Sequence, residues 1–163
     1  MAPRPAPTMA GSAADARGLP MTDEDLRDLL GATKVIAVVG LSANPDRASN
    51  QVAWYLHHQG YRLFGVNPGC PEPEVHGIPM VASLDQVPEP IDIVDVFRRP
   101  EHTPEVARAA VAAGARALWL QLGIRSDEAR AIATEAGLRY VEDRCLKVEH
   151  ARLLGGRGRE AAG

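Results

Sequence analysis

The fold is decided by the apolar run Val35-Ile-Ala-Val-Val39 and by the loop that follows it, Gly40-Leu-Ser-Ala-Asn-Pro-Asp-Arg-Ala-Ser49. Five consecutive apolar residues are typical of a strand that is buried on both faces, as in a parallel sheet. Gly40 gives the backbone freedom to turn at the end of that strand. Because free N–H groups and the dipole at a helix N-terminus attract anions, a strand, a loop and a helix in this order predict a site for a phosphate-bearing nucleotide.

Outward from this stretch, apolar runs and amphipathic segments take turns along the chain. We expect further strands at 61–66, 79–81, 91–97, 117–121 and 138–142. We expect helices at 22–30, 49–59, 104–113, 126–136 and 146–153. This alternation predicts an α/β fold in which helices cover both faces of a mostly parallel sheet. With right-handed crossovers, the result is a single-domain, three-layer, doubly wound (Rossmann-like) fold.

Length and composition suit one globular domain. The chain has 163 residues, of which 45% are hydrophobic and 24% are charged, and this length leaves no room for a second substantial domain. Residues 1–19 are rich in Ala, Pro, Gly and Ser, a composition that predicts a disordered N-terminal tail. We expect the folded domain at 20–154 and a flexible C-terminal tail at 155–163.

Charge and hydropathy exclude several classes of function. A formal net charge of −3 gives no general attraction to nucleic acid or to an anionic membrane. No apolar run approaches the roughly 20 residues that span a bilayer, and the N-terminus has no signal-peptide core. The two cysteines, Cys70 and Cys145, form neither a disulfide framework nor a metal-ligand spacing. We therefore expect a cytoplasmic protein that binds neither nucleic acid nor a membrane nor a metal.

The first loop carries several donors for a phosphate. Ser42 and Ser49 have hydroxyl groups, Asn50 has an amide, and Arg47 has a guanidinium that can pair with phosphate oxygens. The negative charge of Asp46 does not suit phosphate binding, and its side chain is expected to face solvent. The predicted ligand-binding residues of this loop are Gly40, Leu41, Ser42, Pro45, Arg47, Ser49 and Asn50.

A second loop should face the first one. Ligands of open α/β sheets bind outside the carboxyl ends of the strands, at the point where the strand order reverses. In the expected order, the strand at 91–97 flanks that point and continues into Arg98 and Arg99. These arginines can hold phosphates, and Phe97 can pack on an apolar or aromatic part of the ligand.

Two further loops end at the same edge of the predicted sheet. Asn67 and Pro68 follow the second strand, where an adenosine moiety would lie, and Asn67 can hydrogen-bond the base or the ribose. Gln121 ends the fifth strand and would point its amide at the mouth of the crevice. The predicted site thus draws on four loops.

The first loop is not a dinucleotide fingerprint. The pattern G-x-G-x-x-G would place glycines at positions 42 and 45, where this chain has Ser42 and Pro45. A site for NAD would also place an acidic residue at the end of the second strand, where this chain has Asn67. NAD is therefore disfavoured, whereas NADP stays open because Arg62 or Arg98 can accept a ribose phosphate.

Together these segments resemble the small, stand-alone CoA-binding proteins, whose Rossmann-like domain also opens the succinyl-CoA synthetase alpha subunit. The resemblance covers about 34–153 and is specific as a set. The matching segments are Ile36-Ala-Val-Val-Gly-Leu-Ser42 with Pro45, Arg47 and Ser49, Gly60-Tyr61, Val66-Asn-Pro68, Ile91-Asp-Ile-Val-Asp-Val-Phe-Arg98, Trp119-Leu-Gln-Leu-Gly123 and Asp143-Arg-Cys145.

The resemblance implies that the ligand is CoA or an acyl-CoA. Its diphosphate would lie on the 40–50 loop, its adenosine near Asn67, and its pantetheine arm along Phe97, Arg98 and Gln121. The phosphorylated histidine of the synthetase subunit belongs to a second domain with no counterpart in these 163 residues, so ligase activity is not implied. We expect a CoA-binding module without catalytic residues, which acts as a carrier, a sensor or a partner subunit.

Alternatives to this interpretation stay open. The chain can instead be an acyl-CoA-dependent enzyme, or a domain for NAD(P) or another nucleotide. The sequence also leaves open a homodimer and an unknown protein partner. Cys145 follows Arg144 at the start of the last helix, where a thiolate is favoured, but a buried, inert cysteine is the preferred interpretation. For Asp92 and Asp95, which lie on opposite faces of one strand, we prefer structural bracing to acid–base catalysis.

Overall fold

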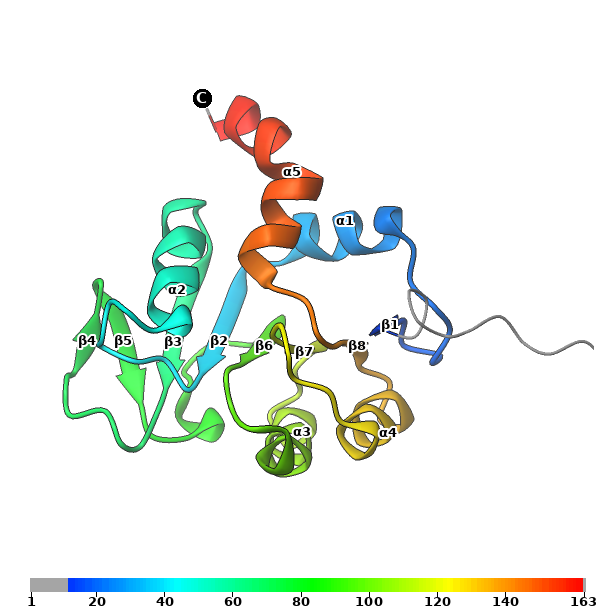
Figure 1. Ribbon diagram of the computed structural model, residues 1–163, viewed down its shortest axis with the longest axis horizontal. Coiled ribbons are helices and arrows are strands. Elements are labelled where there is room, and N and C mark those ends of the chain that lie inside the picture. The colour runs from blue at the N-terminus through cyan, green and yellow to red at the C-terminus, as the bar shows by residue number, and fades with distance from the viewer. Residues whose placement is uncertain (1–11, 163) are drawn as a thin grey trace, which may run out of the picture.

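The computed structural model describes residues 12–162, and the side chains of residues 12–155 (Figure 1). Its eight strands form one sheet in the order β1-β8-β7-β6-β2-β3-β5-β4. The strands are β1 (Ala13–Ala14), β2 (Val35–Val39), β3 (Arg62–Val66), β4 (Glu74–Val75), β5 (Ile78–Val81), β6 (Ile93–Val96), β7 (Ala117–Leu120) and β8 (Arg139–Val141). The helices are α1 (Asp23–Ala32), α2 (Ala48–His58), α3 (Thr103–Ala112), α4 (Asp127–Glu135) and α5 (Leu146–Ala162), with short 3-10 turns η2 (Leu84–Gln86) and η3 (Pro100–His102).

Helices cover both faces of the sheet (Figure 1). Helices α1, α2 and α5 pack on one face, and α3 and α4 pack on the other. Strand β2 is buried throughout and divides its side chains between the two cores: Ile36 and Val38 face the first set of helices, and Ala37 and Val39 face the second. This alternation follows from the two-residue period of a strand. The predicted three-layer, doubly wound α/β fold is therefore confirmed.

The strand order reverses at β2. The chain builds β3 and β5 on one side of β2 and then crosses over to build β6, β7 and β8 on the other side, with every neighbouring pair from β5 to β8 parallel. Val39, the last residue of β2, is in register with Val66 of β3 and with Val96 of β6. The carboxyl ends of β2 and β6 therefore lie side by side at the reversal point, as the sequence predicted.

Local signals in the sequence account for the ends of the elements. Thr22 caps α1: its hydroxyl accepts from the Asp25 N–H at 3.1 Å, and the Asp25 carboxylate accepts from the Thr22 N–H at 2.9 Å. This capping box satisfies N–H groups that have no partner inside the helix. At the amino end of β2, the Asp92 carboxylate accepts the N–H groups of Lys34 and Val35 at 2.9 and 3.0 Å. Asp92 thus braces the sheet at the edge opposite the predicted site.

One hairpin was not predicted. Strand β4 pairs with β5 in the antiparallel sense around a two-residue turn, His76 and Gly77, which have φ angles of 57° and 80°. Two successive positive φ angles match the right-handed twist of a hairpin. The hairpin adds a short antiparallel strand to the outer edge of the sheet, in a segment for which no strand was expected.

The termini also differ from the prediction. Residues 12–19 were expected to belong to a disordered tail, but β1 pairs in the antiparallel sense with β8 and buries Ala13 and Ala14 completely. Methyl side chains fit this crowded edge, and a composition rich in alanine gives no sign of the pairing. At the other end, α5 continues to Ala162, whereas a flexible tail was expected from residue 155. Residues 1–11 of the predicted N-terminal tail lie outside the described part of the chain.

Within residues 12–162, no helix combines the length and the apolar character that crossing a bilayer requires.

Candidate functional site

The loop between β2 and α2 holds its own shape through side-chain contacts. The Ser49 hydroxyl accepts the Ser42 N–H at 3.1 Å, and the Ser42 hydroxyl accepts the Asn44 N–H at 3.1 Å. The Asn44 side chain accepts the Asp46 N–H at 2.9 Å. These bonds within the protein hold the backbone at the start of α2 in one arrangement.

Two asparagines that were predicted to contact the ligand also brace the loop. The Asn50 amide donates to the Ser42 carbonyl at 2.9 Å, and its oxygen pairs with the His76 ring at 2.7 Å. The Asn67 amide donates to the Leu41 carbonyl at 3.0 Å. These bonds give both residues a positioning role that the sequence did not reveal, because their partners lie elsewhere in the chain.

The loops after β2 and β6 touch at Gly40. Its φ angle is 92°, and its N–H donates to the carbonyl of Val66 at 2.8 Å. A methyl group at this position would lie 2.6 Å from the backbone carbonyl oxygen of Phe97. Only glycine combines this backbone conformation with such a close approach. Gly40 therefore fixes the spacing of the two loops that flank the reversal point.

A cavity of about 520 Å³ lies between these two loops, and we call it the crevice. It brings together seven residues that the sequence predicted for the site, and adds Ala48, Pro100 and Ile124. Three exposed guanidinium groups stand around it, those of Arg47, Arg98 and Arg99. Within residues 12–155, none of the three pairs with a carboxylate. The predicted residues that line the crevice are Gly40, Ser42, Arg47, Ser49, Phe97, Arg98 and Arg99.

A second, smaller cavity of about 200 Å³ lies on the α3 side of the same edge, and we call it the side cavity. Arg98 lines both cavities, and the predicted residue Pro68 lines this one. Its walls are mainly apolar, with Ser83, His102 and Glu105 as additional polar groups. These three were missed, although the topology brings the segments after the third and fourth parallel strands to one edge. The apolar walls are Val39, Val66, Ala82, Leu84, Val106 and Ala109.

Gln121 does not point into the crevice as predicted. Its side chain is buried, and its amide donates to the Asp95 carboxylate at 2.5 Å. Asp95 is fully buried, and among the described residues its other carboxylate oxygen has no hydrogen-bond partner. Burial raises the pKa of Asp95 to about 7, because an ionised carboxylate loses its hydration there. Ile124, and not Gln121, lines the crevice.

The cysteines and histidines do not form a reactive centre in the crevice. Cys145 is half-buried, packs against the core and lines a neighbouring groove. The Cys70 thiol lies 3.2 Å from the Glu72 carboxylate, and burial together with this contact raises its pKa. Among residues 12–155, no group of three or more His, Cys, Asp or Glu side chains could hold a metal ion.

Comparison with known proteins identifies the class of this fold and site. Residues 34–151 match the model of the CoA binding domain, so the chain belongs to that family. It is 40% identical over 127 residues to the uncharacterized protein YneT of Bacillus subtilis (strain 168), covering 78% of this chain and 93% of that protein.

Solved structures share the fold. A hypothetical protein from Pyrococcus horikoshii OT3 matches with a TM-score of 0.79 and 41% identity, over 83% of this chain and 94% of that one. A dinucleotide-forming acetyl-coenzyme A synthetase of Ca. Korarchaeum cryptofilum matches with a TM-score of 0.59 and 21% identity, over 68% of this chain and 26% of that one. The second likeness concerns the fold alone.

Proposed function

We propose that the protein binds coenzyme A in the crevice, with the diphosphate at the N-terminus of α2. The observation that carries this proposal is the meeting of Arg47 with Arg98 and Arg99 across the Gly40 contact, in a chain that belongs to the CoA-binding domain family. Guanidinium groups form strong, charge-assisted hydrogen bonds with phosphates. The start of a helix adds free N–H groups and a favourable dipole.

The two ends of CoA then go in opposite directions from the diphosphate. The adenosine lies in the side cavity near Pro68, where apolar walls suit an aromatic base and polar groups line the same cavity. Arg98 reaches either cavity and can therefore serve a phosphate at the junction. The pantetheine arm leaves along Phe97 and Ile124. Gln121 is omitted from this path because its amide is already bound to Asp95.

The crevice favours binding without catalysis. A nucleophilic or acid–base mechanism needs a nucleophile within reach of a base, and a base that is held in place. The side chains that line the crevice are hydroxyl, guanidinium and apolar groups, with the Ser49 hydroxyl already accepting a backbone N–H. This composition suits a carrier, a sensor or the binding subunit of a larger assembly.

Isothermal titration of the purified protein with CoA, NAD, NADP and ATP tests the choice of ligand. We expect CoA to bind most tightly, since it alone has a pantetheine arm to lie along Phe97 and Ile124. Equal or tighter binding of NAD would overturn the proposal. An equal preference for NADP would replace CoA with a phosphorylated dinucleotide.

The variant Arg47→Ala tests the position of the diphosphate. Loss of a charge-assisted hydrogen bond should weaken CoA binding by about 1–3 kcal/mol. Arg108→Ala is the matched control, because Arg108 is an exposed arginine on α3 that lines neither cavity. If both variants bind CoA like the unmodified protein, Arg47 does not hold the diphosphate.

A further inference from the structure

A groove of about 560 Å³ lies beside the crevice, between the start of α5 and the loop that joins β7 to α4. We call it the α5 groove, and its walls include Leu122, Arg125, Cys145, Val148 and Arg152. Its volume falls in the range of small-molecule sites, about 300–1,000 Å³. The function proposed above does not use it.

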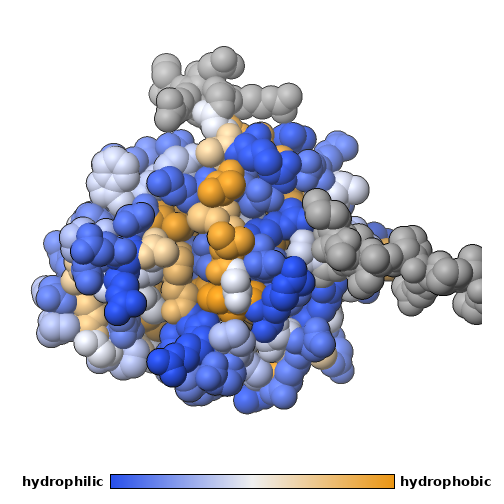
Figure 2. Space-filling model, viewed as in Figure 1, coloured by the Kyte–Doolittle hydropathy of each residue, from blue (hydrophilic) through white to orange (hydrophobic). Residues whose placement is uncertain are grey.

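Apolar side chains are exposed along this groove. Leu122 and Val148 leave 70% and 57% of their surface in solvent, the two highest values among the large exposed hydrophobic residues described. Figure 2 shows hydrophobic surface gathered at the centre of this face, over the start of α5 and the loops below it. Exposed apolar surface that gathers in one hollow is typical of a binding site.

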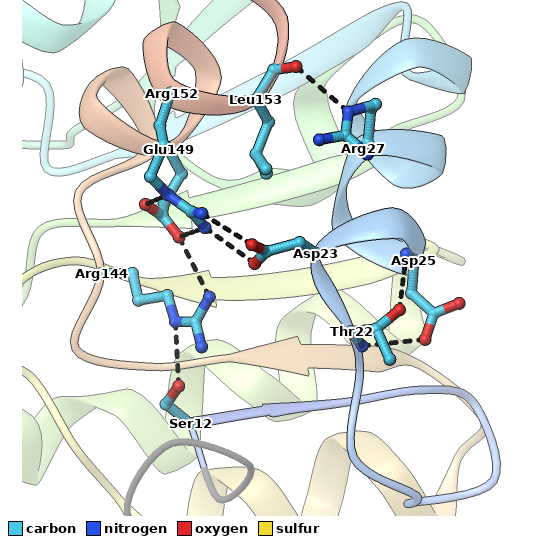
Figure 3. Close-up of polar contacts among 9 residues, drawn as sticks. All are labelled: Ser12, Thr22, Asp23, Asp25, Arg27, Arg144, Glu149, Arg152 and Leu153. Carbon is cyan, nitrogen blue, oxygen red and sulfur yellow. Dashed lines mark hydrogen bonds and ion pairs between the residues drawn. The ribbon is translucent and has the colours of Figure 1, made fainter.

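The charges around the groove are already paired. Figure 3 shows that Arg144, Glu149, Arg152 and Asp23 form one network that joins α5 to α1. The ion pairs are Arg144 with Glu149 at 3.0 Å, Arg152 with Asp23 at 2.8 Å, and Arg125 with Asp143 at 2.7 Å. An anionic ligand would have to compete with these carboxylates for the arginines. An uncharged apolar group would need only to pack against the side chains of Leu122 and Val148.

One short turn joins the groove to the crevice. Ile124 lines the crevice, and its neighbours Leu122 and Arg125 line the groove. The turn is held in place by Asp143, whose carboxylate accepts the Gly123 N–H at 2.7 Å. One turn therefore forms part of the wall of both the crevice and the groove, and a flexible chain that leaves the crevice past Ile124 has the groove as its neighbouring cavity.

From the shared turn and the exposed side chains of Leu122 and Val148, we infer that the α5 groove receives the acyl group of an acyl-CoA, and that this group is aliphatic and uncharged. The inference rests on the proposed function, because it needs the pantetheine arm to leave the crevice past Ile124. It makes an acyl-CoA the preferred ligand over free CoA. Leu122 and Val148 are the residues that select for the acyl chain.

Titration with CoA and with acetyl-, butanoyl-, hexanoyl- and succinyl-CoA tests this inference. Affinity should rise by about 2- to 4-fold for each methylene added to the acyl chain. The upper figure, about fourfold, corresponds to full burial of a CH₂ group. Succinyl-CoA, whose acyl group ends in a carboxylate, should show no gain over CoA. The variants Leu122→Ser and Val148→Ser should bind CoA unchanged and lose the gain with chain length. Leu19→Ser, a change at another exposed leucine outside the groove, should keep it.

The possible failures are distinguishable. If CoA binds and the affinity does not depend on the acyl chain, the inference is wrong and the proposed function stands. If neither CoA nor any acyl-CoA binds, the proposed function fails and the inference fails with it. Sedimentation of the same variants covers a third case: if Leu122→Ser changes the oligomeric state but not the preference for acyl chains, the groove is a contact between copies of this chain, and the inference is overturned.

Discussion

The variant Gly40→Ala tests whether the contact between the loops after β2 and β6 is rigid. The added methyl group would lie 2.6 Å from the carbonyl oxygen of Phe97, and that oxygen belongs to the backbone. The backbone at the end of β6 would therefore have to move, and the crevice with it. Gly60→Ala is the matched control: its φ angle of 93° is almost the same as the 92° of Gly40, but nothing lies within 4 Å of its added methyl group.

The two variants separate the cost of a positive φ angle from the cost of the steric clash. A non-glycine residue with positive φ costs about 1–2 kcal/mol, and the less flexible unfolded chain returns about 0.4–1 kcal/mol. Gly60→Ala should therefore destabilise the protein by about 1 kcal/mol. Gly40→Ala adds the clash, for which overpacking of a tight site suggests about 1–3 kcal/mol more. We expect about 3 kcal/mol in total.

Thermal denaturation and titration with CoA measure both effects. For a chain of this size, 1 kcal/mol corresponds to about 2–4 °C in Tm. We expect Tm to fall by about 2–4 °C for Gly60→Ala and by about 6–12 °C for Gly40→Ala. CoA should bind to the first variant normally and to the second at least about tenfold more weakly, since Arg98 and Arg47 are no longer correctly spaced. Equal losses of Tm in the two variants would refute the rigid contact.

Two other changes give further tests. The Asp95 carboxyl has its pKa raised from 3.8 to about 7 by burial, so it keeps its proton in the folded protein at pH values where the unfolded chain has lost it. The contribution of this group to the free energy of unfolding is therefore greatest below about pH 4, and it falls by about 1.4 kcal/mol per pH unit up to about pH 7. In urea titrations across this range, Asp95→Asn should remove that part of the slope, and an unchanged slope would contradict the assignment. Thr22→Ala removes the capping box of α1 and should cost about 1 kcal/mol, or about 2–4 °C in Tm. Thr22→Ser keeps the hydroxyl and should lose much less, and equal losses in the two variants would show that the cap contributes nothing.

Most of the fold was predictable because its signals are local. The apolar run of β2, the alternation of strands with helices, and the polar caps at Thr22 and Ser126 each act within a few residues. The handedness of the crossovers then leaves few arrangements of the strands. The meeting of the first loop with Phe97 and Arg98 followed from that topology, without any signal that links the two segments in the sequence.

The sequence alone therefore determined the class of fold, the edge of the sheet at which the candidate site lies, and the residue types that gather there. Only the tertiary structure decided which polar side chains are hydrogen-bonded within the protein and which face the crevice. The amide of Gln121 meets Asp95, 26 residues away, and Asn50 meets His76, also 26 residues away. Hydrogen bonds depend on distances of a few tenths of an ångström between side chains that packing brings together, and neither spacing nor composition records those distances. The arginines line the crevice as predicted, whereas the side-chain amides of Gln121 and Asn50 are hydrogen-bonded within the protein and support it.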